Sequence, residues 1–360
     1  MKISSRVYRA AAKSILGLVI AVSVGVLIFV GLQVSGKNKL YKTASAGPNL
    51  ALASIPVESV SPSTGNDTEV ATDDNWQEGD IRYKGVHYRY NSDVLTFLFM
   101  GVDKMTQVKP PKNAIDGGQA DALFLLVLDP HTKEASIIGI NRDTKAEIQI
   151  CTESGLFVGT IMDEICLQHA YGDGAEQSCE LTVEAVSKLF YELPIHGYCA
   201  INMGAIPLLN DAVGGVKVTV LEDVINSNLK KGQEVTLRGE NAYKYLHNRD
   251  LKSDLSAARR LERQKQYLAA YYATAMAQTK QDITLPVKLF TTVSKYMVTD
   301  ITTDEVTYLS TQAIDYTFDS DHIYSLQGET FVENDFEAFY PDETALYELI
   351  LEVFYEEVAD

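Results

Sequence analysis

Three short apolar runs between residues 96 and 143 constrain the fold of this chain more than any other feature. They cover residues 97–100, 122–128 and 136–140, contain β-branched or aromatic residues, and are bounded by Gly, Asp and Pro. Runs of this length and composition are typical of strands that are buried on both faces. The core is therefore predicted to contain a β-sheet.

The turn between the second and third runs predicts how these strands pair. Residues 129–132 read Asp-Pro-His-Thr, a turn sequence that favours an antiparallel hairpin and returns Arg142 to the side of Asp121. If the first strand also pairs antiparallel with the second, one edge of the sheet holds Asp103, Asp121, Arg142 and Asp143. Two carboxylates suit a hard cation such as Mg²⁺ (or Mn²⁺), and a guanidinium group suits a phosphate. The residues of this edge therefore predict a binding site for a diphosphate.

The order of these charged residues resembles a known protein family. A strand that ends in G-x-D, an Asp that opens the next strand and a strand that ends in x-x-R-D resemble the LytR-CpsA-Psr family of cell-wall glycopolymer transferases. One departure is Lys104, because the family usually has Ser or Thr and then Arg after the first Asp. The resemblance covers about residues 81–357.

A second group of charged residues lies between residues 241 and 264. Ser253 and Asp254 are good caps for a helix that is predicted to run to about residue 278. Arg260, Arg263 and Gln264 are spaced at i, i+3 and i+4 on this helix and are expected to share one exposed patch. Together with Arg249, just upstream of the helix, they would form the second wall of a phosphate pocket.

The same segment carries the family's second signature, which is R-x-R followed by a helix with D-x-x-R-x-x-R-Q. Arg249 matches the second arginine of the pair, and the two arginines and the glutamine of the predicted patch match the last three positions. His247 replaces the first arginine, and Ala257 replaces the motif's Asp. Asp254 lies three residues earlier, so either it substitutes for that Asp or the contact is lost.

The resemblance implies a phosphotransferase that moves a glycopolymer, teichoic-acid-like or capsular, from a polyprenyl-diphosphate carrier to peptidoglycan. Asp103 and Asp121 would hold Mg²⁺, because charge neutralisation and positioning do most of the catalysis in phosphoryl transfer. Catalysis would depend on these two residues and on Arg142, and a carboxylate would deprotonate the acceptor hydroxyl, with Asp103, Asp143 and Asp254 as candidates. The diphosphate would be bound by Arg142, Arg249, Arg260, Arg263 and Gln264.

Two other functions stay open. The departures at His247 and Ala257 would support a module that binds or senses the diphosphate lipid without turnover. Metal-dependent activity without an acceptor would support a pyrophosphatase. A polyprenyl chain also needs an apolar groove, which Phe99, Leu123 and Leu125 could form with helices predicted at residues 181–193 and 261–272, although such residues equally form an ordinary core.

The N-terminal segment predicts attachment to a membrane. Residues 1–13 are basic and residues 14–36 carry no charge, which favours a single-pass transmembrane helix with a cytoplasmic N-terminus. A cleaved signal peptide ending near residues 44–46 is the alternative. Residues 37–79 would be a flexible extracellular linker, and residues 80–358 one extracellular catalytic domain.

The expected fold of this domain is α/β (α+β), with a central mixed, largely antiparallel sheet flanked by helices. Further elements include a strand at residues 81–90 and a loop at residues 151–163. The net charge of −18 argues against a nucleic-acid partner. Cys166 and Cys179 are candidates for a disulfide, although free thiols are an equal alternative.

Overall fold

The computed structural model describes residues 30–42, 47–55, 75–109, 117–152, 154–250, 256–318, 320–333 and 335–358. Most of the predicted span at residues 14–36, much of the predicted linker and Asp254 lie outside these residues. A helix covers residues 30–40, so the first residues of the predicted linker are helical. Among the residues described, no helix is both long and apolar enough to cross a membrane.

A six-stranded mixed sheet forms the centre of the molecule, with strand order β11-β8-β3-β4-β5-β12. The three predicted central strands are present, and β4 pairs antiparallel with both β3 and β5. β8 is parallel to β3, β12 is parallel to β5, and β11 is antiparallel to β8. The predicted mixed sheet is therefore confirmed. Its strands are β3 (Leu95–Val102), β4 (Ala120–Asp129), β5 (Glu134–Ile140), β8 (Gly197–Asn202), β11 (Met297–Thr299) and β12 (Ile323–Ser325).

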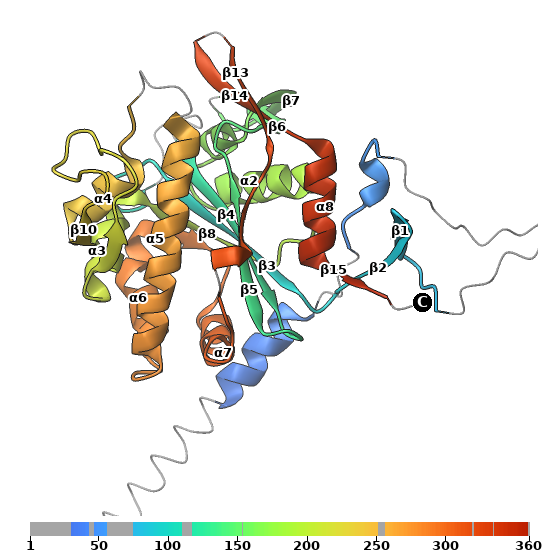
Figure 1. Ribbon diagram of the computed structural model, residues 1–360, viewed down its shortest axis with the longest axis horizontal. Helices are drawn as coiled ribbons and strands as arrows, with labels where there is room; N and C mark the ends of the chain where they lie inside the picture. Colours follow the sequence, from blue (N-terminus) through green and yellow to red (C-terminus); the bar gives the residue numbers. More distant parts are fainter. Residues whose placement is uncertain are drawn as a thin grey trace, which may run out of the picture.

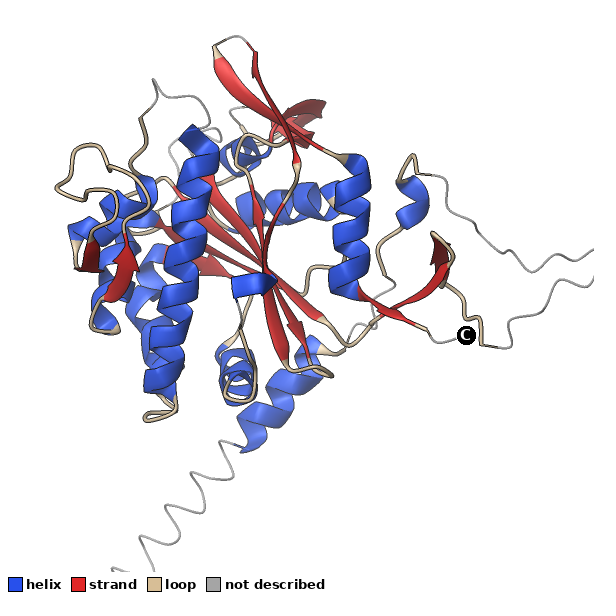
Figure 2. Cartoon of the chain, in the orientation of Figure 1, coloured by secondary structure: helices blue, strands red, loops and turns tan. Residues whose placement is uncertain are grey.

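Helices cover both faces of this sheet, which gives three layers (Figures 1 and 2). Alternation along β4 explains the arrangement, because Leu123 and Leu125 belong to the large core that contains residues of α2 and α8, whereas Phe124 packs with Leu261 of α5. One face carries α2 (Glu176–Leu189) and α8 (Glu343–Phe354), and the other carries α3 (Ile206–Ala212), α4 (Glu240–His247), α5 (Ser256–Thr279) and α6 (Leu285–Val293).

Two β-hairpins project together from one end of the sheet (Figure 1). The first consists of β6 (Lys145–Cys151) and β7 (Phe157–Glu164), and the second of β13 (Gly328–Glu333) and β14 (Phe336–Pro341). The prediction of a loop at residues 151–163 was wrong, because most of that segment pairs as β7. An isolated bridge between Thr144 and Phe339 joins the two hairpins at their base.

The remaining elements lie at the periphery. The single strand predicted at residues 81–90 is instead a hairpin, because Lys84 and Gly85 both have positive φ and form a turn. This hairpin is completed by a C-terminal strand. These elements are β1 (Ile81–Tyr83), β2 (Val86–Tyr90), β15 (Tyr355–Glu357), the pair β9 (Val216–Thr219) and β10 (Glu234–Leu237), α7 (Thr303–Ala313), and the 3₁₀ helices η1 (Leu50–Leu52), η2 (Ile165–Tyr171), η3 (Met203–Ala205), η4 (Ser294–Tyr296) and η5 (Ser320–His322).

Candidate functional site

Arg142 lies just beyond the end of β5 and beside the start of β4, as the predicted hairpin requires. Its Nη1 forms an ion pair with Asp121 Oδ1, and its Nε lies 3.0 Å from Asp143 Oδ1. Its Nη2 donates a hydrogen bond to Gln119 Oε1 at 2.7 Å. The guanidinium group is thus held in one orientation by three side chains, two of which were predicted.

Arg260 joins this group from the other half of the sequence. It lies in the first turns of α5, is buried, and places Nη1 3.2 Å from Asp121 Oδ2. Each oxygen of Asp121 therefore accepts from a different guanidinium group. Burial lowers the pKa of Arg260, Asp121 raises it, and the positive charges of Arg249 and Arg142 lower it again. The charges of Arg249 and Arg142 are thus both close enough to act on Arg260, and a concentration of positive charge of this kind favours binding of a polyvalent anion.

Asp103 lies at the same edge and is exposed. Its Oδ1 accepts a hydrogen bond from the Gln119 amide at 2.8 Å, and its own amide donates to the Gln119 carbonyl at 3.0 Å. The intervening Gly118 has φ +85°, and a Cβ atom there would lie 2.9 Å from Asp103 Oδ1 and 2.7 Å from Lys104 Cε. Gln119 and Gly118 were not predicted to matter, although the pair Gly117-Gly118 immediately before β4 was a signal of a tight backbone approach.

Asp143 is buried, and its Oδ2 has no hydrogen-bond partner among the residues that the structure describes. Burial raises the pKa of this carboxyl group, the guanidinium groups of Arg142 and Arg249 lower it, and the carboxylate of Glu337 raises it again. The net result is a raised pKa. Such a carboxyl group can accept or hold a proton more readily than an exposed aspartate.

Arg249 follows α4 and donates from Nη1 to Ser256 Oγ at 3.4 Å, so it lies at the start of α5 as predicted. His247, which replaces an arginine of the family motif, stacks on Tyr243 with ring centroids 4.8 Å apart. The charges of both Asp121 and Asp103 raise the pKa of Tyr243, although burial is the larger cause. This stacked aromatic pair therefore borders the carboxylate edge.

Arg263 and Gln264 do not share an exposed patch with Arg260, so that prediction was wrong. Arg263 is 1% exposed and donates to the carbonyl groups of Tyr245 and Asn248, while its Nε lies 3.0 Å from Glu222 Oε1. Gln264 is also buried and donates to the Leu246 carbonyl at 3.1 Å. Both side chains satisfy carbonyl groups at the end of α4, a need that helical spacing alone does not reveal. They position the segment that carries Arg249.

Cys166 and Cys179 are buried free thiols, so the candidate disulfide is not formed. Burial raises the pKa of the Cys166 thiol to about 12, although the nearby Arg142 lowers it. Neither sulfur is therefore an activated nucleophile.

The carboxylates of the edge fit a metal ion only with help from a substrate. Among the described residues there is no group of three or more Asp, Glu, His or Cys side chains that could hold a metal. Asp103 is exposed, but both oxygens of Asp121 contact arginines. Mg²⁺ commonly uses only one or two carboxylates and completes its shell with phosphate oxygens and water. Asp103 and Asp121 supply two carboxylates at this edge, which is the number that this smaller requirement calls for.

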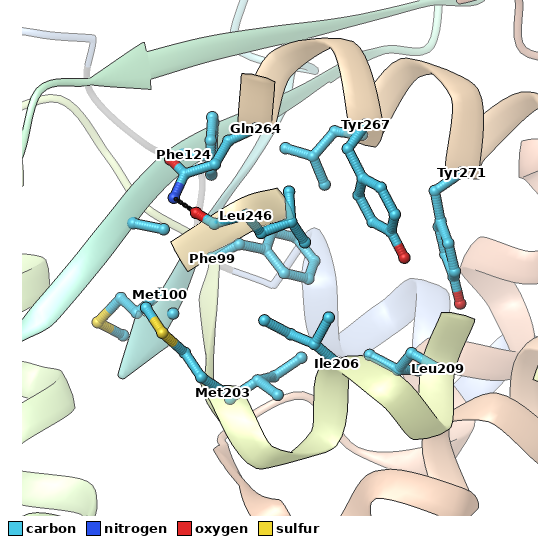
Figure 3. A pocket seen from close by; sticks show the side chains of 14 residues that line it. Phe99, Met100, Phe124, Met203, Ile206, Leu209, Leu246, Gln264, Tyr267 and Tyr271 are labelled. Atoms are coloured by element: carbon cyan, nitrogen blue, oxygen red, sulfur yellow. Dashed lines mark hydrogen bonds between the residues drawn. The ribbon is translucent and has the colours of Figure 1, made fainter. Parts of the chain in front are cut away.

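An apolar cavity of about 180 Å³ lies beside the charged residues, between the sheet and helices α3, α4 and α5 (Figure 3). Ala122, the neighbour of Asp121, and Gln264, one turn beyond Arg260, both contribute to its wall. Phe99 also lines it, as predicted for an apolar groove, whereas Leu123 and Leu125 face the opposite layer. The lining residues are Phe99, Met100, Gly101, Ala122, Phe124, Ile201, Met203, Ile206, Leu209, Leu246, Gln264, Tyr267, Leu268 and Tyr271.

Fold and site together define an α/β protein with a cluster of arginine and aspartate side chains next to an apolar cavity. A family model described as the LytR_cpsA_psr family matches residues 59–351, so the chain belongs to the LytR-CpsA-Psr family, as the sequence motifs predicted. A curated relative is the polyisoprenyl-teichoic acid–peptidoglycan teichoic acid transferase TagU of Oceanobacillus iheyensis. It is 29% identical over 238 residues, which are 64% of this chain and 66% of that protein. The match thus spans just under two thirds of the relative's length.

Solved structures share the fold. The crystal structure of Bacillus subtilis TagV aligns with a TM-score of 0.55 and 24% identity over 71% of this chain and 94% of that one. The protein gbs0355 of Streptococcus agalactiae aligns with a TM-score of 0.59 and 21% identity over 73% and 87% of the two chains. At this identity the similarity concerns the architecture alone.

Proposed function

We propose that this protein transfers a glycopolymer from a polyprenyl-diphosphate carrier to peptidoglycan. The observation that carries the proposal is the convergence of Arg142 and Arg260 on Asp121, with Arg249 close to Arg260, beside a cavity whose lining is almost entirely apolar. A diphosphate with a hydrocarbon chain needs both environments next to each other. Family membership and the names of the curated relatives, teichoic acid transferases, support the same reaction.

In this proposal the arginines neutralise the diphosphate. An acceptor hydroxyl oxygen forms a bond to the glycan-bearing phosphorus, the bond from that phosphorus to the bridging oxygen breaks, and polyprenyl phosphate leaves. Three positive groups stabilise the negative charge that collects on the phosphate oxygens. Arg142 has the most rigid setting of the three, because three side chains orient it before the substrate arrives.

The hydroxyl proton goes to a carboxylate of the edge in this scheme. Asp103 is exposed to an incoming acceptor, and Asp143 has a raised pKa but is buried. We therefore assign the base to Asp103 and a supporting role to Asp143, which holds Arg142. A bound Mg²⁺ would supply further neutralisation of the phosphate oxygens, with Asp103 and Asp121 as its protein ligands.

The apolar cavity would receive the first isoprene units of the carrier. Its volume of about 180 Å³ suits the first part of a chain rather than a whole polyprenyl tail. The rest of the tail would stay in the lipid, which requires the domain to lie at a membrane surface. We place the protein at the cell membrane as a single-pass protein with its domain outside.

The direct test uses the full chain in detergent micelles with a short polyprenyl-diphosphate glycan, with and without peptidoglycan fragments, and with Mg²⁺ or EDTA. Glycan on the acceptor, absent in Arg142→Ala and reduced by EDTA, is the expected result. Phosphate release without labelled acceptor would replace the proposal with a pyrophosphatase. Tight binding without any product would replace it with a lipid-binding module.

A further inference from the structure

Glu337 connects the second hairpin to the start of α5. Its Oε1 accepts hydrogen bonds from the Ser256 amide at 3.2 Å and from Ser256 Oγ at 3.4 Å, and its Oε2 accepts from the Ala257 amide at 3.4 Å. These two amides belong to the first turn of the helix. Amide groups in the first turn have no hydrogen-bond acceptor within the helix itself. A carboxylate from a strand about 80 residues away therefore caps the helix that carries Arg260.

The same strand is fixed to the other half of the site. Phe339, two residues beyond Glu337 in β14, donates from its amide to the Asp143 carbonyl at 2.8 Å and forms a bridge with Thr144. Strand β14 thus bonds to the segment that carries Arg142 and, through Glu337, to the helix that carries Arg260. Strand β4 also contacts both segments, but it does so through the side chain of Asp121, which pairs with Arg142 and Arg260.

The charge of Glu337 also reaches the arginines. Ser256 Oγ, which donates to Glu337, accepts a hydrogen bond from Arg249 Nη1 at 3.4 Å. The carboxylate further contributes to the raised pKa of Asp143. Ala257, in contrast, is buried and offers no carboxylate at the first turn of α5, where the family motif has an Asp. A negative charge at this helix end is therefore supplied from β14.

We propose that Glu337 is a positioning residue of the diphosphate site, which sets the spacing between Arg142 and the pair Arg249 and Arg260 and replaces the missing carboxylate at position 257. The identity of the ligand in this inference rests on the proposed function. The contacts of Glu337 do not depend on that function. A displacement of about 1 Å in a catalytic group can cost about 100-fold in rate. The effect of Glu337 should therefore appear in ligand affinity and turnover and not only in stability.

The variants that test this are Glu337→Gln, Glu337→Ala and Glu337→Ala combined with Ala257→Asp, all in the full chain in detergent micelles. Gln keeps an acceptor for one helix amide but removes the charge. Ala257→Asp returns a charge to the first turn, three residues before Arg260. Glu333→Gln is the matched control, because Glu333 lies on the same hairpin but binds Tyr340 Oη at 2.8 Å.

Affinity for farnesyl diphosphate is the first readout. We expect Kd to rise about 10-fold in Glu337→Gln and further in Glu337→Ala, with Glu333→Gln unchanged and the double variant within about 3-fold of wild type. Wild-type affinity in Glu337→Ala, or no recovery in the double variant, would overturn the inference. If the double variant recovers the thermal midpoint but not the affinity, the inference is also overturned, because Glu337 would then act only as a helix cap.

A second readout needs no ligand. Hydrogen exchange at the amides of Ser256 and Ala257 should be faster in Glu337→Ala and unchanged in Glu333→Gln, because only the first variant removes the acceptor of these amides. Unchanged exchange would overturn the inference. If wild type does not bind farnesyl diphosphate, the proposed function fails, and exchange still decides whether Glu337 positions α5.

Discussion

The Nη1 atom of Arg260 lies 3.2 Å from Oδ2 of Asp121, although 139 positions separate the two residues in the chain. The contact forms only when α5 lies on the sheet, so the site is completed by folding of the whole domain. Because Asp121 also pairs with Arg142, its carboxylate spaces the two guanidinium groups on either side of it. An arriving phosphate finds these groups already arranged, which lowers the cost of ordering them on binding.

This arrangement predicts different outcomes for the two partners of one ion pair. Arg142→Ala should lower kcat/KM for glycan transfer by about 100-fold or more, because a preorganised charge contact with the reacting group is lost. Asp121→Asn should abolish Mg²⁺-dependent turnover but leave farnesyl diphosphate affinity equal or higher, because the arginines lose a competing carboxylate. Transfer assays and calorimetry separate these effects.

Lys217→Ala is the control, since Lys217 forms an exposed pair with Glu234 at 2.9 Å, on a strand that carries none of the site residues. It should behave like wild type in both measurements. Weaker farnesyl diphosphate binding in Asp121→Asn would contradict this prediction, because it would show that the order which Asp121 gives the two arginines outweighs its competition with the phosphate.

Arg263 should behave differently from Arg142, because its partners are backbone carbonyls of the protein itself. Arg263→Met should lower the free energy of unfolding by about 3 kcal/mol, since two carbonyl groups and Glu222 lose a buried partner. Urea denaturation of both variants measures the loss in free energy of unfolding, which should be larger in Arg263→Met than in Arg142→Ala. A larger loss of stability in Arg142→Ala would show that the roles of the two arginines are reversed.

Sequence reasoning succeeded where local pattern determines structure. The apolar runs and the turn at residues 129–132 were sufficient to place Asp121 beside Arg142, because hairpin register follows from the turn and the alternation of buried residues. The family motif added the expectation that Arg249 and Arg260 approach this edge.

The errors arose where the outcome depends on contacts between distant segments. Helical spacing predicts that Arg263 lies on the same side of the helix as Arg260. It does not reveal which backbone carbonyl groups lie opposite that side. The segment containing β7 has an irregular pattern, and its pairing with β6 was missed. Glu337 gave no local signal, because its function depends on where β14 meets α5.

Gly118 is expected to be essential for the position of Asp103. Gly118→Ala should lower transfer activity by about 10-fold or more, because its Cβ would lie 2.9 Å from Asp103 Oδ1 in addition to the strain of a positive φ. Gly155→Ala is a matched control, since Gly155 has φ +80° and nothing within 4 Å of the added atom. Comparable activity losses in both variants would mean that backbone strain, and not the close approach, is responsible.

The buried carboxyl group of Asp143 predicts a pH dependence of stability. Because its pKa is raised in the folded protein, chiefly by burial, it stabilises the fold at pH below its ordinary pKa of 3.8. This contribution is lost as the pH rises through the folded value. In Asp143→Asn this loss should disappear, so the free energy of unfolding of the variant relative to wild type should increase with pH above 3.8. Urea denaturation at several pH values measures this slope, and a decrease would contradict the raised pKa.

The apolar cavity predicts how the chain recognises the hydrocarbon part of its substrate. Ile206 and Leu208 are neighbours on α3, but Ile206 lines the cavity and Leu208 is 41% exposed. Ile206→Trp should fill much of the available volume and raise KM for a polyprenyl-diphosphate glycan by about 10-fold or more. Leu208→Trp should leave KM unchanged, because it adds the same side chain on the outside of the same helix.

Binding of inorganic diphosphate separates a filled cavity from a damaged charge site. It should be equal in wild type, Ile206→Trp and Leu208→Trp, because the side chains that hold the arginines do not line the cavity. These side chains are Gln119, Asp121, Asp143 and Ser256. If Ile206→Trp weakens inorganic diphosphate binding as much as it raises KM, the substitution has disturbed the arginines. If KM stays at the wild-type value while Trp occupies the cavity, the hydrocarbon chain follows another path, and the cavity beside Asp121 has no part in recognising it.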